Sequence, residues 1–255
     1  MIDSFYTTQF TPEKNSLTGK NIVVTGAGDG IGRIAALTFA NLGATVILVG
    51  RTLSKLESVY DEIENNNNPK PAIFPLHLEH ASEHDYIIMQ ATLEKEFGKL
   101  DGLLHNAGEL GTRTPVADYA ITEWQKVMHV NVTAPFLMTK ALFPLMKKAD
   151  SASIIFTGSS VGKTGRAYWG AYAVSKAASE NLMQLLADEC DEVNNIRVNS
   201  INPGAVRTAM RGKAYPAEDP ANVTPAENIM NTYTFLMDDA SKGVNGQQFD
   251  AQPKK

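Results

Sequence analysis

The sequence contains a single cysteine, Cys190, and this scarcity limits what the chain can build. One cysteine excludes a disulfide within the chain and is typical of proteins that work in the reducing cytoplasm, which is the expected location. Its neighbours along the sequence are acidic rather than cationic, because Asp191 and Glu192 follow it. We therefore interpret Cys190 as a structural thiol rather than a nucleophile.

The chain also lacks a long apolar run and an excess of positive charge. No stretch reaches the ~20 apolar residues that cross a bilayer, and the N-terminus lacks the basic and then apolar plan of a signal peptide. With 23 Lys and Arg against 28 Asp and Glu, the net charge is −5. A nucleic-acid partner would require a basic face, so neither a membrane nor a nucleic acid is an expected partner.

What is present is a regular alternation of short β-branched runs with longer apolar-periodic segments. This alternation predicts an α/β fold: a single-domain, Rossmann-type, doubly wound parallel sheet in three layers. The expected strands are 20–25, 44–49, 72–78, 100–105, 153–157, 195–201 and 246–250. The expected helices are 33–42, 54–64, 82–97, 122–148, 170–192 and 225–237.

Three segments depart from the alternation. Residues 1–19 are expected to form an N-terminal extension that packs on, or trails from, the domain 20–255. Residues 205–224 contain prolines and charges with little periodicity, which is typical of a loop or a small lid. Pro135 and Pro144 fall inside the expected helix 122–148 and predict a kink or a break there.

A glycine-rich turn, TGAGDGIG at residues 25–32, lies between the first expected strand and the first expected helix. Such glycines let the backbone approach a pyrophosphate, which then lies on the N–H groups at the start of the helix. A turn without a ligand is the alternative, and the flanking strand and helix disfavour it, since together they frame a dinucleotide-binding βαβ unit. The predicted cofactor contacts of this turn are Gly26, Gly28, Asp29, Gly30, Ile31 and Gly32.

A tyrosine and a lysine stand four residues apart in the stretch that begins the expected helix 170–192. On a helix, Tyr172 and Lys176 share one face, and a cation beside a phenol favours the phenolate. That arrangement would let a tyrosine exchange protons near neutral pH. Taken alone the pair is a weak signal, because any amphipathic helix can carry a core-edge tyrosine and a solvated lysine by chance.

These motifs, taken in order, resemble those of the short-chain dehydrogenases/reductases over nearly the whole chain, from Lys20 to Asp250. Residues 25–32 match the family's cofactor motif, and His105-Asn106-Ala107-Gly108 is similar to its strand-four motif, with His in the first place. Ser159 stands thirteen residues before Tyr172, which is the usual interval of the family. The remaining matches are Asn131, Tyr172-x-x-x-Lys176, and Pro203-Gly204 with Thr208.

A closer resemblance is to the bacterial YciK-type oxidoreductases, a subgroup of the family. It rests on residues 165–172, 197–204 and 249–253, and it does not supply a substrate. The resemblance implies a dinucleotide-binding oxidoreductase domain at 20–255 with a small substrate lid at about 205–224. It also implies a homodimer or homotetramer formed through the two long helices, here 122–148 and 170–192.

The resemblance implies an enzyme that interconverts a carbonyl and a secondary alcohol on a small molecule. Tyr172 would exchange the proton and Lys176 would lower the pKa of that tyrosine and hydrogen-bond the nicotinamide ribose. Ser159 would hold the substrate oxygen, with Ser160 as the competing hydroxyl, and Asn131 would anchor a water that relays protons. The implied cofactor contacts outside the glycine turn are Arg51, Asn106, Ala107, Gly108, Tyr172, Lys176, Pro203, Gly204 and Thr208.

Two other functions compete with this one. A non-catalytic member of the same fold could sense a dinucleotide, although such a protein would not need the complete set of Asn131, Ser159, Tyr172 and Lys176. A methyltransferase that binds S-adenosylmethionine on a related fold would have a different glycine motif and no use for the Tyr–Lys pair.

The cofactor choice depends on Arg51. An acidic residue after the second strand binds the 2′-hydroxyl of NAD, whereas Arg accommodates the 2′-phosphate of NADP. The acid is missing here and Arg51 follows Gly50, so we expect NADP (as NADPH in reduction) and consider NAD the lesser alternative. Asp29 departs from the basic residue that many NADP-preferring relatives carry, and Arg51 could instead be a solvated charge.

His77 stands near the end of the third expected strand, at a position where the family usually has an aspartate that contacts the adenine. His77 could stack on the adenine or hydrogen-bond to it instead, or face solvent. His77, His80 and His84 also suggest a metal site, but their spacing crosses a strand end and a helix start, so we expect no metal. The substrate pocket is expected from residues 109–116, 163–169 and 209–222.

Overall fold

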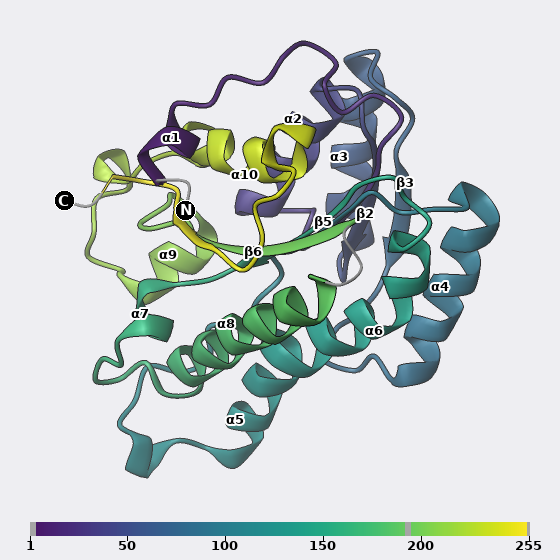
Figure 1. The fold of residues 1–255 in the computed structure, drawn as a ribbon. Helices are drawn as coiled ribbons and strands as arrows, with labels where there is room; N and C mark the ends of the chain where they lie inside the picture. Colours follow the sequence, from purple (N-terminus) through teal and green to yellow (C-terminus); the bar gives the residue numbers. More distant parts are fainter. Residues whose placement is uncertain (1–3, 192–194, 254–255) are drawn as a thin grey trace.

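The computed structural model describes residues 4–191 and 195–253, and it contains one sheet whose strands are all parallel (Figure 1). The sheet has seven strands in the order β3-β2-β1-β4-β5-β6-β7, each hydrogen-bonded to its neighbours in parallel register. The predicted doubly wound α/β fold is confirmed. The strands are β1 (Asn21–Thr25), β2 (Thr45–Gly50), β3 (Ala72–Pro75), β4 (Gly102–His105), β5 (Ala152–Thr157), β6 (Ile196–Asn202) and β7 (Gln248–Asp250).

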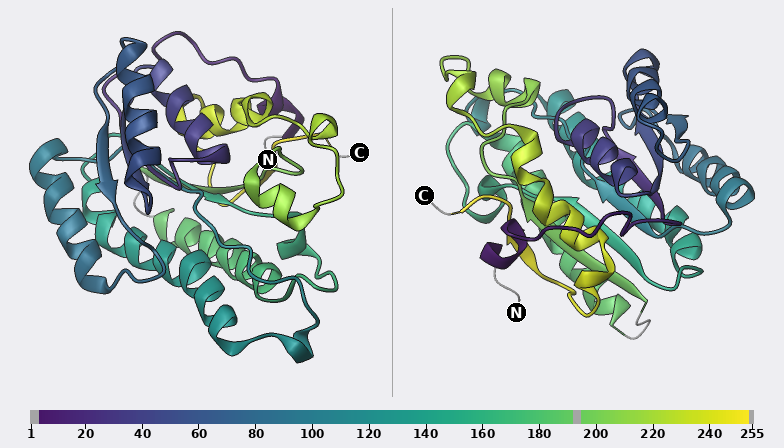
Figure 2. Two further views of the ribbon diagram at one scale, coloured as in Figure 1. Left: turned by 180° about the vertical axis from the view of Figure 1, so that it is seen from behind. Right: turned by 90° about the horizontal axis from the view of Figure 1, so that it is seen from above.

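Helices cover both faces of the sheet, which gives three layers (Figure 2). One layer comprises α2 (Gly30–Asn41), α3 (Leu53–Asn65) and α10 (Met230–Met237). The other comprises α4 (Glu83–Phe97), α5 (Ile121–Met128), α6 (Ala134–Met146) and α8 (Gly170–Cys190). Successive residues of a strand point to opposite faces, so Val24 packs with the first layer while Val23 packs with the second. No helix of the described residues combines the length and the apolar character that crossing a bilayer requires.

The expected helix 122–148 is interrupted, as its prolines predicted, but the interruption precedes both of them. A π-helical turn, His129–Thr133, separates α5 from α6. Pro135 has no N–H to give to the carbonyl of Asn131, so that carbonyl needs another partner. It accepts a hydrogen bond from the Ser179 hydroxyl of α8 at 2.9 Å. The break therefore joins α5 and α6 to α8 and fixes the backbone of Asn131.

Element ends differ from the prediction by a few residues where local contacts decide them. The expected strand 72–78 ends at Pro75, because a turn follows in which the His77 carbonyl accepts the His80 N–H at 2.9 Å. The expected helix 33–42 begins three residues earlier, at Gly30, since the Asp29 carboxylate accepts the Gly30 N–H at 2.8 Å and caps it. The expected helix 225–237 starts with a 3₁₀ turn, Ala226–Ile229, before α10.

The described part of the N-terminal segment packs on the domain. Its short helix α1 (Ser4–Thr8) lies against α10, as Figure 2 shows from above. The hydroxyls of Thr7 and Thr232 are 3.2 Å apart, and the Asn231 amide donates to the Thr8 carbonyl at 2.9 Å. The extension therefore covers part of the outer surface of α10.

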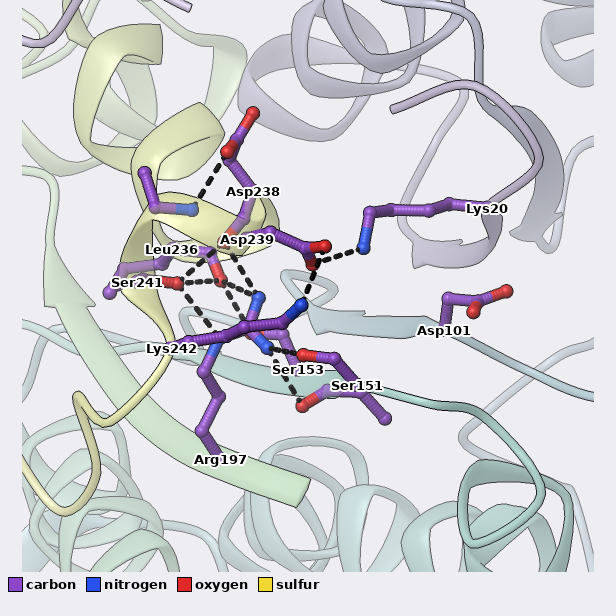
Figure 3. A network of polar contacts seen from close by, with 12 residues as sticks. Lys20, Asp101, Ser151, Ser153, Arg197, Leu236, Asp238, Asp239, Ser241 and Lys242 are labelled. Atoms are coloured by element: carbon purple, nitrogen blue, oxygen red, sulfur yellow. Dashed lines mark hydrogen bonds and ion pairs between the residues drawn. The ribbon is translucent and has the colours of Figure 1, made fainter. Parts of the chain in front are cut away.

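A buried arginine connects the layers near the amino end of β6 (Figure 3). Arg197, 5% exposed, donates to the hydroxyls of Ser241 at 2.8 Å and Ser151 at 2.7 Å, and to the carbonyl of Asp238 at 2.9 Å. Burial lowers the pKa of the Arg197 guanidinium to about 10, so it stays charged at neutral pH. The Arg197 contacts join β6, the start of β5 and the turn that follows α10.

The acidic neighbour of this network, Asp239, lies nearer the surface. Its carboxylate pairs with Lys20 at 2.6 Å and with Lys242 at 2.9 Å. These two ion pairs connect the turn after α10 to the start of β1.

Candidate active site

The candidate site lies where the chain path across the sheet reverses. The chain leaves β1 toward β2 and β3 on one side, whereas β4 lies on the other side of β1 and leads to β5, β6 and β7. Parallel sheets bind ligands at the carboxyl ends of strands on either side of such a point. A cavity of about 500 Å³ opens there, and among the predicted site residues it is lined by Gly26, Gly28, Asp29, Gly30, Ile31, Arg51, Asn106, Ala107, Gly108, Ser159, Tyr172, Lys176, Pro203, Gly204 and Thr208.

Two predicted residues, Gly32 and Asn131, support this cavity from behind rather than line it. A Cβ at Gly32 would collide with the carbonyl of Gly26 and lie 2.6 Å from the Asn106 amide. Only glycine lets α2 approach β1 this closely. Gly26 has φ = 68° and Gly30 has φ = 53°, a region that glycine occupies readily, and they direct the chain around the first turn of α2.

The glycine turn and the segment after β4 are held together by one threonine. The Thr25 hydroxyl accepts the N–H groups of Asn106 and Ala107, both at 3.0 Å, and the Asn106 amide donates to the Thr25 carbonyl at 3.2 Å. Two loops that are eighty residues apart in sequence therefore form one rigid surface. The exposed N–H groups at the start of α2 face this surface and can hold a pyrophosphate.

The histidine that begins the strand-four motif serves the core rather than the cavity. His105 is 5% exposed, its Nε2 lies 2.8 Å from the Thr139 hydroxyl, and its ring packs 4.7 Å from that of Phe156. Burial, with a smaller effect of the Lys176 charge, lowers the pKa of His105 to about 3. It is therefore neutral at the pH at which the protein works.

Two ion pairs occupy the end of the cavity nearest β2. Arg51 lies 3.9 Å from the Glu109 carboxylate, and Lys55 lies 2.5 Å from the Asp29 carboxylate. The hydrogen bond from Lys55 lowers the pKa of Asp29, so this carboxylate is charged but paired. The sequence analysis missed Lys55, although its place one turn after Arg51 at the start of α3 was a usable signal. Arg51 and Lys55 therefore place two cationic side chains at this end, each beside a carboxylate.

The predicted catalytic group converges at the other end of the cavity. The Lys176 ammonium lies 5.6 Å from the centre of the Tyr172 ring and donates to the Thr157 carbonyl at 2.7 Å. Burial raises the pKa of Tyr172 to about 12, and a hydrogen bond with Ser159 opposes this rise. The expectation that Lys176 lowers this pKa is therefore wrong for the described structure, because burial outweighs the polar contacts of the phenol. Ser159 faces the cavity, whereas Ser160 begins the short helix α7 (Ser160–Lys163) and is exposed.

The Lys176 ammonium is itself perturbed. Burial lowers its pKa to about 8, while the charge of Glu180 acts in the opposite direction. The phenol of Tyr172 and the ammonium of Lys176 are therefore both protonated near neutral pH. This is the protonation state in which the tyrosine can donate a proton to a bound oxygen.

Asn131 holds the loop after β4. Its amide donates to the Glu109 carbonyl and to the Ser175 hydroxyl, both at 2.9 Å, and its Oδ1 accepts the Glu109 N–H at 2.7 Å. A Cβ added at Gly108 would lie 3.5 Å from Asn131 Oδ1 and 3.8 Å from Lys176 Nζ. The side chains of Asn131 and Lys176 therefore both lie next to Gly108, and the hydrogen bonds of Asn131 hold the loop in position.

The three segments expected to build the substrate pocket meet around stacked side chains. The Arg113 guanidinium lies 4.7 Å from the Trp169 ring and 5.2 Å from the Tyr215 ring, and it donates to the Ala214 carbonyl. Trp169 and Met210 line the cavity, whereas Tyr168 is 55% exposed. Helix α9 (Ala209–Ala214) and its flanking loops therefore close over the tyrosine end.

The segment 205–224 is anchored at both ends by one side chain near the C-terminus. The Gln252 amide donates to the Pro203 and Ala205 carbonyls at 2.7 and 2.9 Å, and its oxygen accepts the Thr224 hydroxyl at 2.8 Å. Gln252 was not predicted from the sequence to have this role.

A cluster of two histidines and a glutamate lies at the rim of the cavity. It differs from the three histidines that were considered from the sequence, His77, His80 and His84. Donor atoms of His77, Glu79 and His80 all lie within 4.8 Å of one another, and the cluster found does not include His84. The rings of His77 and His80 stack at 4.6 Å, and Lys126 lies 3.5 Å from the Glu79 carboxylate, so that carboxylate already has a cationic partner.

Comparisons with known proteins agree with this fold. The family model described as short chain dehydrogenase matches residues 20–219. YciK of Escherichia coli, described as an uncharacterized oxidoreductase, is 47% identical over 244 residues, which cover 96% of each chain.

Solved structures resemble the whole chain. A short chain dehydrogenase of Escherichia coli, complexed with NADPH, is 48% identical, covers 95% of this chain and 100% of its own, and has a TM-score of 0.92. One from Shigella flexneri, complexed with NADP, is 46% identical, covers 94% and 100%, and also has a TM-score of 0.92. The resemblance found in the motifs is confirmed, and the chain belongs to the short-chain dehydrogenase family and is an oxidoreductase.

Proposed function

We propose that the protein is an NADP-dependent oxidoreductase that interconverts a carbonyl and a secondary alcohol of a small molecule, with Tyr172 as proton donor and acceptor. The observation that carries the proposal is the meeting of Tyr172, Ser159 and Lys176 at one end of a cavity whose other end is a dinucleotide cradle.

The cradle fits an extended dinucleotide. The N–H groups at the start of α2 would hold the pyrophosphate, and the segment after β4 would hold a ribose. Pro203, Gly204 and Thr208 line the cavity toward the tyrosine end, where the nicotinamide would lie. Relatives whose structures were solved with NADPH or NADP share this fold over nearly the whole chain.

The chemistry divides between cofactor and protein. When bound, the nicotinamide supplies or accepts the hydride. Ser159 would hold the carbonyl oxygen and stabilise the negative charge that develops on it. The Tyr172 phenol would donate its proton to that oxygen, and the Lys176 ammonium would stabilise the phenolate that remains. Trp169, Leu110 and Met210 would exclude water from this end of the cavity.

Replacing Tyr172 by Phe tests the catalytic assignment. The phenol is needed only for the proton step, so Tyr172→Phe should bind NADPH as the wild type does while turnover falls by several orders of magnitude. Turnover is measured as NADPH oxidation with a panel of aldehydes and ketones, and binding by quenching of intrinsic fluorescence. Retained turnover would overturn the assignment.

The preference for NADP over NAD rests on Arg51, with Lys55 beside it. A charge-assisted hydrogen bond to a phosphate contributes about 1.5–3 kcal/mol, so Arg51→Ala should raise the KM for NADPH roughly 10- to 150-fold and leave that for NADH nearly unchanged. A wild-type preference for NADH would contradict the proposal.

A non-catalytic dinucleotide sensor is the alternative. It would bind NADPH but oxidise it with no member of the carbonyl panel, and Tyr172→Phe would then change nothing that can be measured. The complete catalytic set around the cavity favours the enzyme.

The remaining expectations concern context. We propose that the protein works in the cytoplasm as a homodimer or homotetramer, with residues 205–224 as a substrate lid. Large apolar side chains exposed on the long helices support the assembly: Phe136 on α6 and Val174 and Leu185 on α8. Light scattering coupled to gel filtration tests it, and a strictly monomeric mass contradicts it.

A further inference from the structure

A buried carboxylate continues the row of side chains that carries the proposed chemistry. On α8, Tyr172, Lys176 and Glu180 stand at intervals of four residues and therefore follow one another along one helix face. Glu180 is 6% exposed, as is Lys176. Acidic side chains are rarely buried unless they are paired, so the position of Glu180 beside the proposed proton-transfer group calls for a cause.

The carboxyl group of Glu180 is held in place by its surroundings. Its Oε2 accepts the hydroxyl of Ser200, on β6, at 2.6 Å, and its Oε1 is buried. A Cβ at Gly158 would collide with Oε1, so glycine at this position, directly before Ser159, makes room for the carboxylate. Burial raises the pKa of Glu180, and hydrogen bonds from Ser200 and Gln248 and the charges of Lys163 and Lys176 oppose the rise.

The Lys176 ammonium has no other anionic neighbour of comparable effect among the described residues. His105, on β4, and Tyr172 are both neutral, and the Thr157 carbonyl contributes only a dipole. The charge of Glu180 is the one influence that raises the pKa of Lys176 against the effect of burial. Tyr233, on α10, is also buried near Tyr172 and stays protonated.

We propose that Glu180 is a positioning residue of the proton-transfer site: its buried carboxylate is the counter-charge that keeps Lys176 protonated and directed toward Tyr172. The catalytic role of Glu180 rests on the proposed function, whereas the electrostatic interaction between Glu180 and Lys176 does not. Without the counter-charge, burial would leave much of the Lys176 population as the neutral amine at the upper end of the working pH range. A neutral amine cannot stabilise a Tyr172 phenolate.

Replacing Glu180 by Gln removes the charge and keeps the shape and the hydrogen bond with Ser200. An opposite charge at about 4–6 Å shifts a pKa by about 1–3 units, and the charge of Glu180 raises the pKa of Lys176, so that pKa should fall by about one unit in Glu180→Gln. The rate of carbonyl reduction should then begin to fall about one pH unit lower in the variant than in the wild type. At acid pH, where Lys176 is protonated in both proteins, the two rates should be equal.

Two readouts separate this proposal from the proposed function. The pKa of Lys176 is followed by NMR of lysine labelled with ¹³C at Cε, with the signal assigned by its loss in Lys176→Arg. This requires no substrate. The pH profile of kcat/KM for NADPH oxidation by a carbonyl requires one. A shifted pKa without any carbonyl turnover would refute the proposed function and leave the pairing standing.

Matched variants complete the design. Glu189→Gln removes the same charge from an exposed position of the same helix and should leave the pKa of Lys176 and the pH profile unchanged. Ser200→Ala keeps the Glu180 carboxyl but removes the hydrogen bond that favours its charged form, so it should shift Lys176 in the same direction and by less. It also serves if Glu180→Gln does not fold. An unshifted Lys176 pKa, or a rate lowered equally at every pH, would overturn the proposal and make Glu180 a packing residue.

Discussion

Replacing Arg197 by Met should destabilise the fold substantially without touching the site. The variant removes a buried, hydrogen-bonded charge and puts an apolar chain of similar length in its place. Most acceptors keep another partner, because the Leu236 carbonyl also accepts from Ser153 at 2.6 Å and the Asp238 carbonyl from Ser241 at 2.9 Å. Ser151, 8% exposed, loses its partner.

The magnitude follows from that inventory. One buried hydroxyl left unpaired and weakened bonds at two carbonyls cost about 2–4 kcal/mol in the free energy of unfolding. For a chain of this size, about 2–4 °C are lost per kcal/mol, so Tm should fall by roughly 5–15 °C. Urea and thermal unfolding measure this, and the KM for NADPH should stay within about twofold of the wild type, because Arg197 lies at the other end of β6 from the cavity.

A surface control isolates the buried contribution. Lys242→Ala breaks only an exposed ion pair with Asp239 and should cost less than about 1 kcal/mol. The view that Arg197 joins the layers would be wrong if Arg197→Met lowered the free energy of unfolding by less than about 1 kcal/mol, or by no more than Lys242→Ala does.

Three further outcomes follow from the structure. Gly32→Ala should weaken NADPH binding at least 10-fold by forcing α2 away from β1, and an unchanged affinity in a fluorescence titration would contradict the contact with Gly26 and Asn106. Burial acts to raise the pKa of Asp239, but hydrogen bonds from Lys20 and Lys242 outweigh it and lower this pKa to about 2. Because the pKa is lower in the folded than in the unfolded protein, the two ion pairs stabilise the fold above about pH 4, and this stabilisation is lost as the pH falls toward 2. Lys20→Ala should therefore lessen the dependence of Tm on acid pH. Burial raises the pKa of Cys190 to about 11, so a thiol reagent should modify it only at the rate of unfolding, and rapid modification at neutral pH would show that it is accessible.

The predicted site residues that line the cavity are those whose place depends on spacing along one element. The glycine turn, Ser159, Tyr172 and Lys176 each stand at the end of a strand or on one face of a helix, and a parallel sheet brings strand ends to one edge. The prolines of the long helix likewise indicated an interruption. Its exact site depended on a hydroxyl of another helix, Ser179, which no local pattern announces.

The residues that the sequence did not indicate act through partners that are distant in the chain. Lys55 matters because Asp29 is beside it, and Gln252 matters because it reaches the Pro203 carbonyl. Such pairs depend on side-chain direction after the sheet has formed, and periodicity contains no information about that. The same reason explains the histidine cluster, where Glu79 rather than His84 joins His77 and His80.

The attachment of both ends of segment 205–224 to Gln252 has a consequence for how this protein can change over evolution. The segment follows β6 and leads into α10, and one side chain holds both of its ends, so its interior can gain, lose or exchange residues while both junctions keep their positions. Substrate range can then diversify independently of the cofactor cradle. By contrast, a change at Gln252 itself would release both ends together, and we expect it to alter lid closure for every substrate at once.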